Sequence, residues 1–370
     1  MTSPSSGDPA GAPPPPASGR DLAKTAAALE TWLASRLGDA REVAVAHLAP
    51  PGGTGFSNDT LLFELSWRDG AGARHERALV ARIAPAGVPV FRHYDVAKQY
   101  RAMALAARHG VPVPELVGLE TGTATLGSPF FVMARAAGRV PTDNPPYHTG
   151  GWVSELRPEE RARLWWSGLD AMARIHRIDP AREDVGFLAE GDGSAAAALD
   201  HWRRYLVWAA EGRPQPVCER ALAWLEAHRP ASAGPVRVCW GDARIGNMVF
   251  DDGRCTAVLD WEMVTLGDPQ QDLAWWLFLD RHHSEGVGAA RLPGFPGRDE
   301  TVARFEAATG LVARELDWYE VFAGFRFGAV MIRVARQLAA LSLLPAGSTF
   351  ETDNTVTRLL ARLLDRLSSS

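Results

Sequence analysis

Lysine is almost missing from this chain of 370 residues. Lysine and arginine together number 39, and only Lys24 and Lys98 are lysine. A P-loop needs a lysine directly after a glycine, and neither lysine has one, so Walker-type nucleotide binding is excluded. A Schiff-base or lysine-nucleophile mechanism is also disfavoured, because both lysines lie in charged stretches of helical character.

Other absences narrow the class further. The net charge is −5 and no basic stripe stands out, which argues against nucleic acid as a partner. No apolar run reaches the roughly 20 residues of a membrane span, and the N-terminus has no signal-peptide pattern. We therefore expect a cytoplasmic protein that does not enter a membrane. Three cysteines without metal-ligand spacing indicate a reducing compartment and buried thiols: Cys218, Cys239 and Cys255.

Composition divides the chain into four parts. Residues 1–19 are rich in proline, glycine, alanine and serine and are expected to be a disordered tail. Residues 20–136 form a first lobe and 137–157 a linker rich in glycine, proline, threonine and asparagine. Residues 158–370 form a second, mainly helical lobe. The length agrees with about two domains.

The first lobe combines short strands with two helices. A helix is predicted over 21–37, closed by Gly38, and a second over 93–109. Alternating β-type runs predict strands at 43–48, 60–67, 77–83, 115–120 and 129–135. The second lobe is predicted to contain helices at 158–178, 197–212, 217–229, 269–281, 299–309, 314–341 and 355–367.

A short β segment between Val236 and Leu259 interrupts the second helical series and has the polar residues of interest. Two strands meeting around Gly253-Arg254 would place Asn247 and Asp260 opposite each other. An amide oxygen and a carboxylate at one end of a hairpin suit Mg²⁺. Asp242, five residues before Asn247, can point to the same place. Each residue alone is better explained as a cap or turn former, but the three together favour a functional site.

The spacing of Asp242, Asn247 and Asp260 resembles that of protein kinases. Trp240-Gly241-Asp242 with Asp260-Trp261-Glu262 is more similar still to the aminoglycoside phosphotransferase family. Leu266-Gly267-Asp268-Pro269, with Asp272-Leu273-Ala274 after it, resembles another element of that family. The resemblance covers about residues 40–345. It implies an α+β, two-lobe, protein-kinase-like fold.

The resemblance also implies a reaction, in which the γ-phosphoryl group of ATP or another NTP moves to a hydroxyl of a small molecule with Mg²⁺ as cofactor. Asp242 would be the base or orienting carboxylate, and Asn247 and Asp260 would hold Mg²⁺. A loop resembling the family's glycine-rich element would contact the nucleotide phosphates through Gly53, Gly55, Ser57 and Asn58.

Arg82 stands where the family has a phosphate-binding lysine, and arginine preserves the charge and can bind phosphate with two hydrogen bonds. Gln99 stands at the position of the helix glutamate that would orient it, and Asp95, one turn earlier, is an alternative partner. Backbone groups around Met133 would contact adenine. Trp240 replaces the usual histidine, whose role is mainly packing.

The adjacent acidic and histidine residues have structural interpretations. Asp268 is predicted to cap a helix and Asp272 to position the catalytic loop. His282 and His283 are predicted to be solvated at a helix end.

The acceptor remains open. The Pro145-Pro146-Tyr147 and Gly151-Trp152 stretches resemble the phosphotransferase branch related to kinase domains fused to acyl-CoA dehydrogenases, which suggests a hydroxyacyl-CoA. Few acidic residues follow Asp272, which disfavours a polycationic aminoglycoside. The competing class is an inactive nucleotide-binding module, motivated by Gln99 and Trp240. A protein kinase is disfavoured because no activation-loop-length insert follows Asp260.

Overall fold

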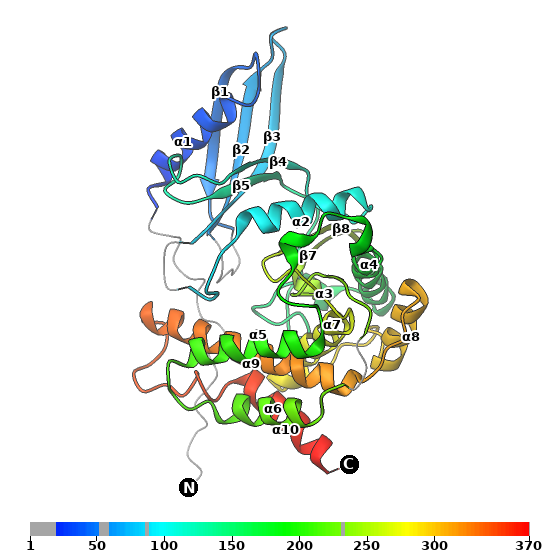
Figure 1. Cartoon of the computed structure of the whole chain (residues 1–370). Helices are drawn as coiled ribbons and strands as arrows, with labels where there is room; N and C mark the ends of the chain where they lie inside the picture. Colours follow the sequence, from blue (N-terminus) through cyan, green and yellow to red (C-terminus); the bar gives the residue numbers. More distant parts are fainter. Residues whose placement is uncertain (1–19, 52–58, 86–88, 231–233, 370) are drawn as a thin grey trace.

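The computed structural model describes residues 20–51, 59–85, 89–230 and 234–369, and it has two lobes (Figure 1). The smaller lobe contains one five-stranded antiparallel sheet of strand order β1-β2-β3-β5-β4. Its strands are β1 (Arg41–Ala49), β2 (Asp59–Arg68), β3 (Arg74–Ile83), β4 (Leu116–Glu120) and β5 (Phe130–Ala134). Arg82 therefore lies at the centre of the sheet, between Thr60 of β2 and Phe131 of β5.

Alternation along β3 and β5 gives this sheet two buried faces. Phe130 and Val132 pack with helix α1 (Leu22–Ala34) in a cluster that belongs to the small lobe alone. Phe131 and Met133 point the other way and join the main core of the protein. Helix α2 (Val96–Arg108) contacts β4 and β5. The sheet is thus covered by α1 and attached to the larger lobe through its other face (Figure 1).

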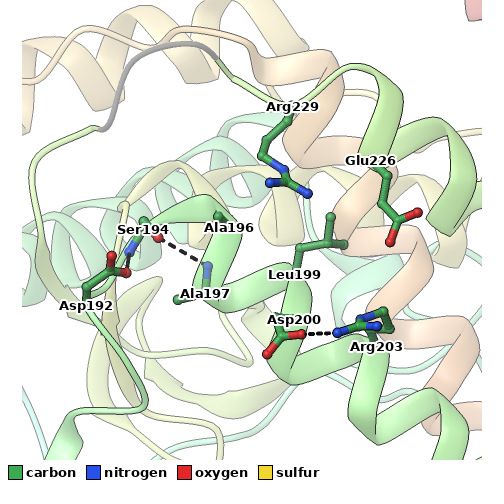
Figure 2. Close-up of a pocket in the computed structure, with 9 residues that line it drawn as sticks. All are labelled: Asp192, Ser194, Ala196, Ala197, Leu199, Asp200, Arg203, Glu226 and Arg229. Atoms are coloured by element: carbon green, nitrogen blue, oxygen red, sulfur yellow. Dashed lines mark hydrogen bonds and ion pairs between the residues drawn. The ribbon is translucent and has the colours of Figure 1, made fainter.

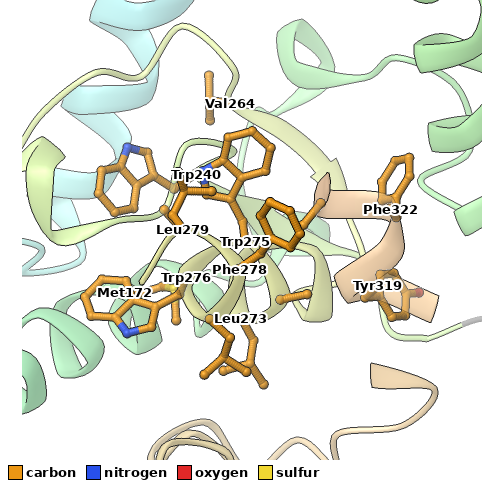
Figure 3. Close-up of a cluster of buried hydrophobic side chains, with 14 of the residues drawn as sticks. Met172, Trp240, Val264, Leu273, Trp275, Trp276, Phe278, Leu279, Tyr319 and Phe322 are labelled. Atoms are coloured by element: carbon orange, nitrogen blue, oxygen red, sulfur yellow. The ribbon is translucent and has the colours of Figure 1, made fainter. Parts of the chain in front are cut away.

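The larger lobe is mainly helical. Its helices are α3 (Trp152–Glu155), α4 (Pro158–His176), α5 (Ala195–Ala210), α6 (Pro216–Ala227), α7 (Gln270–His283), α8 (Arg298–Thr309), α9 (Leu316–Ala340) and α10 (Thr355–Ser368). Helix α7 is buried along most of its length, with Trp275, Trp276 and Phe278 almost fully buried among neighbouring helices (Figure 3). It packs along α9, so these two helices form the centre of the lobe.

Two small antiparallel ribbons lie on this helical lobe, and the sequence predicted only one of the two strand pairings. Strand β6 (Arg237–Cys239) pairs with β9 (Thr265–Gly267), which the sequence did not predict. Strand β7 (Met248–Asp251) pairs with β8 (Arg254–Val258) across a turn at Asp252-Gly253, where both φ angles are positive (46° and 69°). This two-residue turn favours Asp-Gly, and the ribbon has an irregular register beyond it.

The predicted register of this ribbon was wrong by one residue. The Leu259 N–H donates to the Asn247 carbonyl at 2.8 Å, so Asn247 lies opposite Leu259 and Asp260 is the next residue along. A backbone φ of +53° at Asp260 then turns the chain away from the ribbon. The two side chains still lie at the same open end of the hairpin.

The α+β two-lobe fold predicted from the sequence is confirmed, and the predicted tail 1–19 lies outside the described residues. Across the described ranges, none of the helices combines the length and apolar character needed to cross a membrane. All three cysteines are free thiols. Cys218 and Cys239 are buried as predicted, and Cys255 is half-buried. Burial raises the pKa of Cys218 to about 12.

Candidate active site

A short loop, Trp240 to Asn247, connects β6 to β7 and is fixed at its start by Asp272. The Asp272 carboxylate accepts hydrogen bonds from the backbone N–H groups of Trp240 (2.6 Å) and Gly241 (2.9 Å). Gly241 has φ +95°, and a β-carbon there would lie 2.2 Å from the Met263 carbonyl oxygen, so only glycine fits. The prediction that Asp272 positions this loop is confirmed.

Asp242, the next residue, is held on both carboxylate oxygens. The Trp275 indole N–H donates to Oδ1 at 2.7 Å, and the Asn247 amide donates to Oδ2 at 2.6 Å. Arg244 approaches the same carboxylate at 3.3 Å. The Asp242 side chain is 16% exposed, so it retains a small solvent-facing surface. These donors fix the direction of the carboxylate.

Asn247, Asp260 and Arg82 converge on the same place. Asn247 donates a second hydrogen bond to the Asp242 carbonyl at 3.1 Å. Asp260 Oδ1 accepts from Arg82 Nη2 at 2.7 Å, with the two side chains 21% and 14% exposed. This ion pair crosses from the sheet of the small lobe to the ribbon of the large lobe. The structure therefore brings four of the predicted site residues together.

The remaining predicted residues divide into two groups. Gln99 is buried in α2, and Met133 lies in β5 opposite Val80. Within the described ranges, the Arg82 guanidinium bonds neither Gln99 nor Asp95, and Asp95 instead caps α2 by accepting from the Lys98 N–H. The partner of Arg82 in this structure is Asp260. The glycine-rich loop residues Gly53, Gly55, Ser57 and Asn58 lie outside the described residues, so their role stays a prediction.

Arg244 and Trp275 contact Asp242 and were not identified from the sequence. Trp275 lies three residues after Asp272 in α7, so both share one helix face, a signal that the sequence contained. Arg244 also forms an ion pair with Asp143 at 2.5 Å. Asp143 lies 101 positions earlier, in the predicted linker, and nothing in the local sequence indicates that pairing.

The charges of this Arg244 pair are mutually stabilised. Burial by itself would raise the pKa of Asp143, but the Arg244 guanidinium and a hydrogen bond from His283 outweigh it and lower the pKa below its ordinary value. Burial would likewise lower the pKa of Arg244, yet Asp143 and Asp242 raise it. Arg244 is therefore a permanent cation beside Asp242.

The prediction that His282 and His283 are solvated was wrong for His283, and His282 is half-buried with its Nε2 3.0 Å from the Thr355 hydroxyl. His283 is buried and lies between the Leu279 carbonyl (2.7 Å) and Asp143 (3.1 Å). Burial and the neighbouring His283 lower the pKa of His282 to about 3, so His282 is neutral at pH 7. The α7 C-terminus is covered by the linker segment and α10 rather than by water, which a local sequence pattern does not reveal.

The oxygen atoms at this site suit Mg²⁺ in number and type. The Asn247 amide donates two hydrogen bonds through Nδ2 to Asp242, so its orientation leaves Oδ1 as the atom available to a cation. Asp260 adds a carboxylate beside it. In the part of the chain that the structure describes, no cluster of three or more His, Cys, Asp or Glu side chains forms a metal cage. One carboxylate and one amide match Mg²⁺, which takes its remaining ligands from phosphates and water.

A separate pocket of about 600 Å³ lies between the start of α5 and the end of α6 (Figure 2). Its lining includes Asp192, Ser194, Asp200 and Arg229, and the Ser194 hydroxyl caps α5 by accepting from the Ala197 N–H at 3.1 Å. None of the residues predicted for catalysis lines it. This pocket is therefore separate from the candidate site around Asp242.

The two-lobe fold is that of protein-kinase-like phosphotransferases. The model of the phosphotransferase enzyme family (APH) matches residues 51–304, more than half of the chain, so the protein belongs to this family. A putative aminoglycoside phosphotransferase from Ralstonia eutropha has a similar structure, with a TM-score of 0.69 and 22% identity over 92% of this chain and 98% of that one.

A thermostable mutant of aminoglycoside phosphotransferase APH(4)-Ia, solved with AMP-PNP and hygromycin B, shares the fold at a TM-score of 0.51. It is 18% identical, over 87% of this chain and 99% of that one. Curated relatives include the probable acyl-CoA dehydrogenase IBR3 of Arabidopsis thaliana, 28% identical over 75% of this chain. Acyl-CoA dehydrogenase family member 10 of Mus musculus is 31% identical over 54% of it. The matched region spans only 35% and 18% of those two proteins.

Proposed function

We propose that this protein transfers the γ-phosphoryl group of ATP to a hydroxyl group of a small molecule in a Mg²⁺-dependent reaction. The observation that supports this most directly is the convergence of Asp242, Asn247, Asp260 and Arg82 between the two lobes. The nucleotide analogue in the APH(4)-Ia structure is consistent with nucleotide use by the shared fold. ATP rather than another NTP is the simplest assignment.

In the proposed reaction, Asp242 orients the acceptor hydroxyl and takes its proton. The hydroxyl oxygen forms a bond to the γ-phosphorus as the bond from that phosphorus to the β–γ bridging oxygen breaks. Trp275 and Asn247 hold the carboxylate in one direction, which is the kind of positioning on which phosphoryl transfer depends.

Arg82 supplies the phosphate-binding cation that the missing lysine would otherwise provide. In the proposed nucleotide complex its guanidinium contacts the phosphates while Asn247 Oδ1 and Asp260 hold the metal. Bound Mg²⁺ would neutralise the charge of the phosphate oxygens. The glycine-rich loop with Ser57 and Asn58 would lie over the phosphates, Gln99 would lie behind Arg82, and the backbone at Met133 would contact adenine.

A hydroxyacyl-CoA is the first acceptor to test. The supporting observation is that the curated relatives are named as acyl-CoA dehydrogenases and that this chain matches only a part of each. A separate phosphotransferase part acting on a hydroxylated acyl-CoA would share its substrate class with the rest of such proteins. Aminoglycosides are not proposed as acceptors for this chain, because the structural neighbours that are named for them are less than 25% identical to it.

The decisive experiment is an ATP-consumption screen with Mg²⁺ against hydroxyacyl-CoAs, amino sugars and simple alcohols. We expect one class to stimulate turnover, and Asp242→Asn to reduce it by about three orders of magnitude while nucleotide binding persists. Asp252→Asn is the control, because Asp252 is exposed in the hairpin turn. Near wild-type turnover in Asp242→Asn would refute the mechanism, and nucleotide binding without turnover across the screen would favour the inactive binding module.

A further inference from the structure

Arg326, in the middle of α9, is a buried cation that the proposed mechanism does not use. Its exposed fraction is 3%. Its Nη2 donates a hydrogen bond to the Gly241 carbonyl at 2.9 Å. Among the described residues, Nε and Nη1 are buried without a hydrogen-bond partner. Leaving such donors unpaired costs about 1–3 kcal/mol or more each, so an apolar side chain would stabilise the fold better at this position.

The guanidinium of Arg326 contacts the surroundings of Asp242 in two ways. It donates a hydrogen bond to the carbonyl of the Gly241–Asp242 peptide group. The preceding peptide group donates its N–H, that of Gly241, to Asp272. It also lies 4.6 Å from the centre of the Trp275 ring, the same indole that donates to Asp242. One arginine therefore contacts both the backbone before Asp242 and the indole that donates to the Asp242 carboxylate.

Aromatic rings confine this arginine to a single position. Trp202 of α5 lies 5.0 Å from the guanidinium carbon and Phe322 of α9 lies 5.6 Å away. Burial lowers the pKa of Arg326 to about 10, against the opposing effect of Asp272 and Asp242. Arg326 thus remains protonated at pH 7, and its positive charge lies close to the catalytic carboxylate.

We propose that Arg326 is a positioning residue for Asp242: it fixes the Gly241–Asp242 peptide and the Trp275 indole so that the carboxylate faces the acceptor. This inference rests on the proposed phosphotransfer. Arg326 does not touch substrate in this arrangement, so its loss lowers kcat and leaves nucleotide affinity unchanged. Loss of a residue needed only for folding would reduce the amount of folded protein. It would not lower the kcat of the folded protein while leaving its KM unchanged.

The test uses the full chain and the slow hydrolysis of Mg-ATP that the proposed function predicts when water takes the place of the acceptor. Arg326→Met keeps the length of the side chain and removes charge and hydrogen bond. We expect kcat to fall about 10- to 100-fold, with the KM for ATP close to that of the wild type. Arg326→Lys keeps the charge, and we expect it to recover part of kcat.

Arg161→Met is the matched control. Arg161 is also a buried arginine bonded to backbone carbonyls, of Val153, Ser154 and Pro293, but it does not contact the catalytic loop. We expect it to lower stability and leave kcat unchanged. An equal fall in kcat in Arg161→Met and Arg326→Met would overturn the proposal, as would unchanged kcat in both Arg326 variants.

Trp275→Phe keeps a ring beneath the guanidinium and removes the indole N–H. We expect a fall in kcat comparable with that of Arg326→Met, and a double variant no slower than the slower single one, because both act through Asp242. Fully additive losses would overturn the link. If Arg326→Met does not fold, Arg326→Lys and Trp275→Phe decide the question alone. Absence of ATP hydrolysis in the wild type would instead count against the proposed function itself.

Discussion

At the scale of single residues, the scarcity of lysine has a visible consequence. The position that would bind phosphates in the small lobe is an arginine, and Arg82 makes an ion pair with Asp260, itself a predicted Mg²⁺ ligand. The pair joins the two lobes at the proposed site of phosphoryl transfer. A planar guanidinium can bind a carboxylate and a phosphate oxygen at the same time, which a single ammonium group does less well.

Arg82→Ala should raise the KM for ATP by about 10-fold or more, because the nucleotide loses a charge-assisted contact. The fold should change little, since Arg82 belongs to neither hydrophobic cluster of the two lobes. Titration of ATP turnover and of nucleotide binding tests this. Arg77→Ala is the control on the same strand, where an exposed pair with Glu115 is removed. Equal KM values for both variants would contradict the role of Arg82.

Residue by residue, the sequence pointed to the polar groups that follow strands and missed those whose role depends on contacts with distant segments. Asp242, Asn247 and Asp260 lie within a stretch of 19 residues, so their spacing and the predicted ribbon were sufficient to predict that they lie close together. Arg244 was missed because its partner Asp143 is 101 positions away. Arg326 was missed because an arginine in an apolar helix has no pattern that tells whether it faces a loop or solvent.

At the scale of elements, the predicted linker 137–157 is a structural part of the candidate active site. Asp143 pairs with Arg244 of the catalytic loop, and Tyr147 and His148 both hydrogen-bond Asp280 of α7 at 2.9 Å. The glycine- and proline-rich composition predicted a connection and was silent about these contacts. Helix positions came from local periodicity, whereas burial of the α7 C-terminus depends on segments far away in sequence.

Asp143→Asn should lower stability by about 2 kcal/mol at pH 7, the usual value for a hydrogen bond to a charged group. The folded pKa of Asp143 lies below its ordinary value of 3.8, so the contribution is present at neutral pH and disappears as the pH falls through the folded value. The gap between wild type and variant should therefore narrow below about pH 4.

Urea unfolding at pH 7 and at successively lower pH measures this gap. Asp170→Asn provides the comparison, because it removes an exposed pair with Arg304 and should have little effect at any pH. A gap that stays constant down to the lowest pH at which the protein folds would show that Asp143 contributes without its charge. The predicted sign of the pH dependence would then be wrong.

At the scale of the whole molecule, the lobes share a core and are also joined by charges. The main hydrophobic cluster includes Val80 and Met133 from the sheet together with residues of α4, α7 and α9. Helix α2 adds ion pairs to the segment 183–190: Lys98–Glu190, Arg101–Asp184, Arg108–Glu183 and His109–Glu183. In protein kinases a helix glutamate pairs with the phosphate-binding lysine. Gln99 has no charge with which to form such a pair. The ion pairs with the segment 183–190 hold α2 instead.

The two lysines offer a test of this coupling between lobes. Lys98 Nζ lies 2.7 Å from Glu190 across the lobe boundary and is 14% exposed, whereas Lys24 pairs weakly with Asp21 in α1 and is 87% exposed. Lys98→Met should lower the free energy of unfolding by about 1 kcal/mol, less at high salt, while Lys24→Met stays near wild type. Hydrogen exchange should show faster exchange in α2 only for Lys98→Met. Equal exchange in both variants would mean that the Lys98–Glu190 pair does not help to hold α2 on the larger lobe.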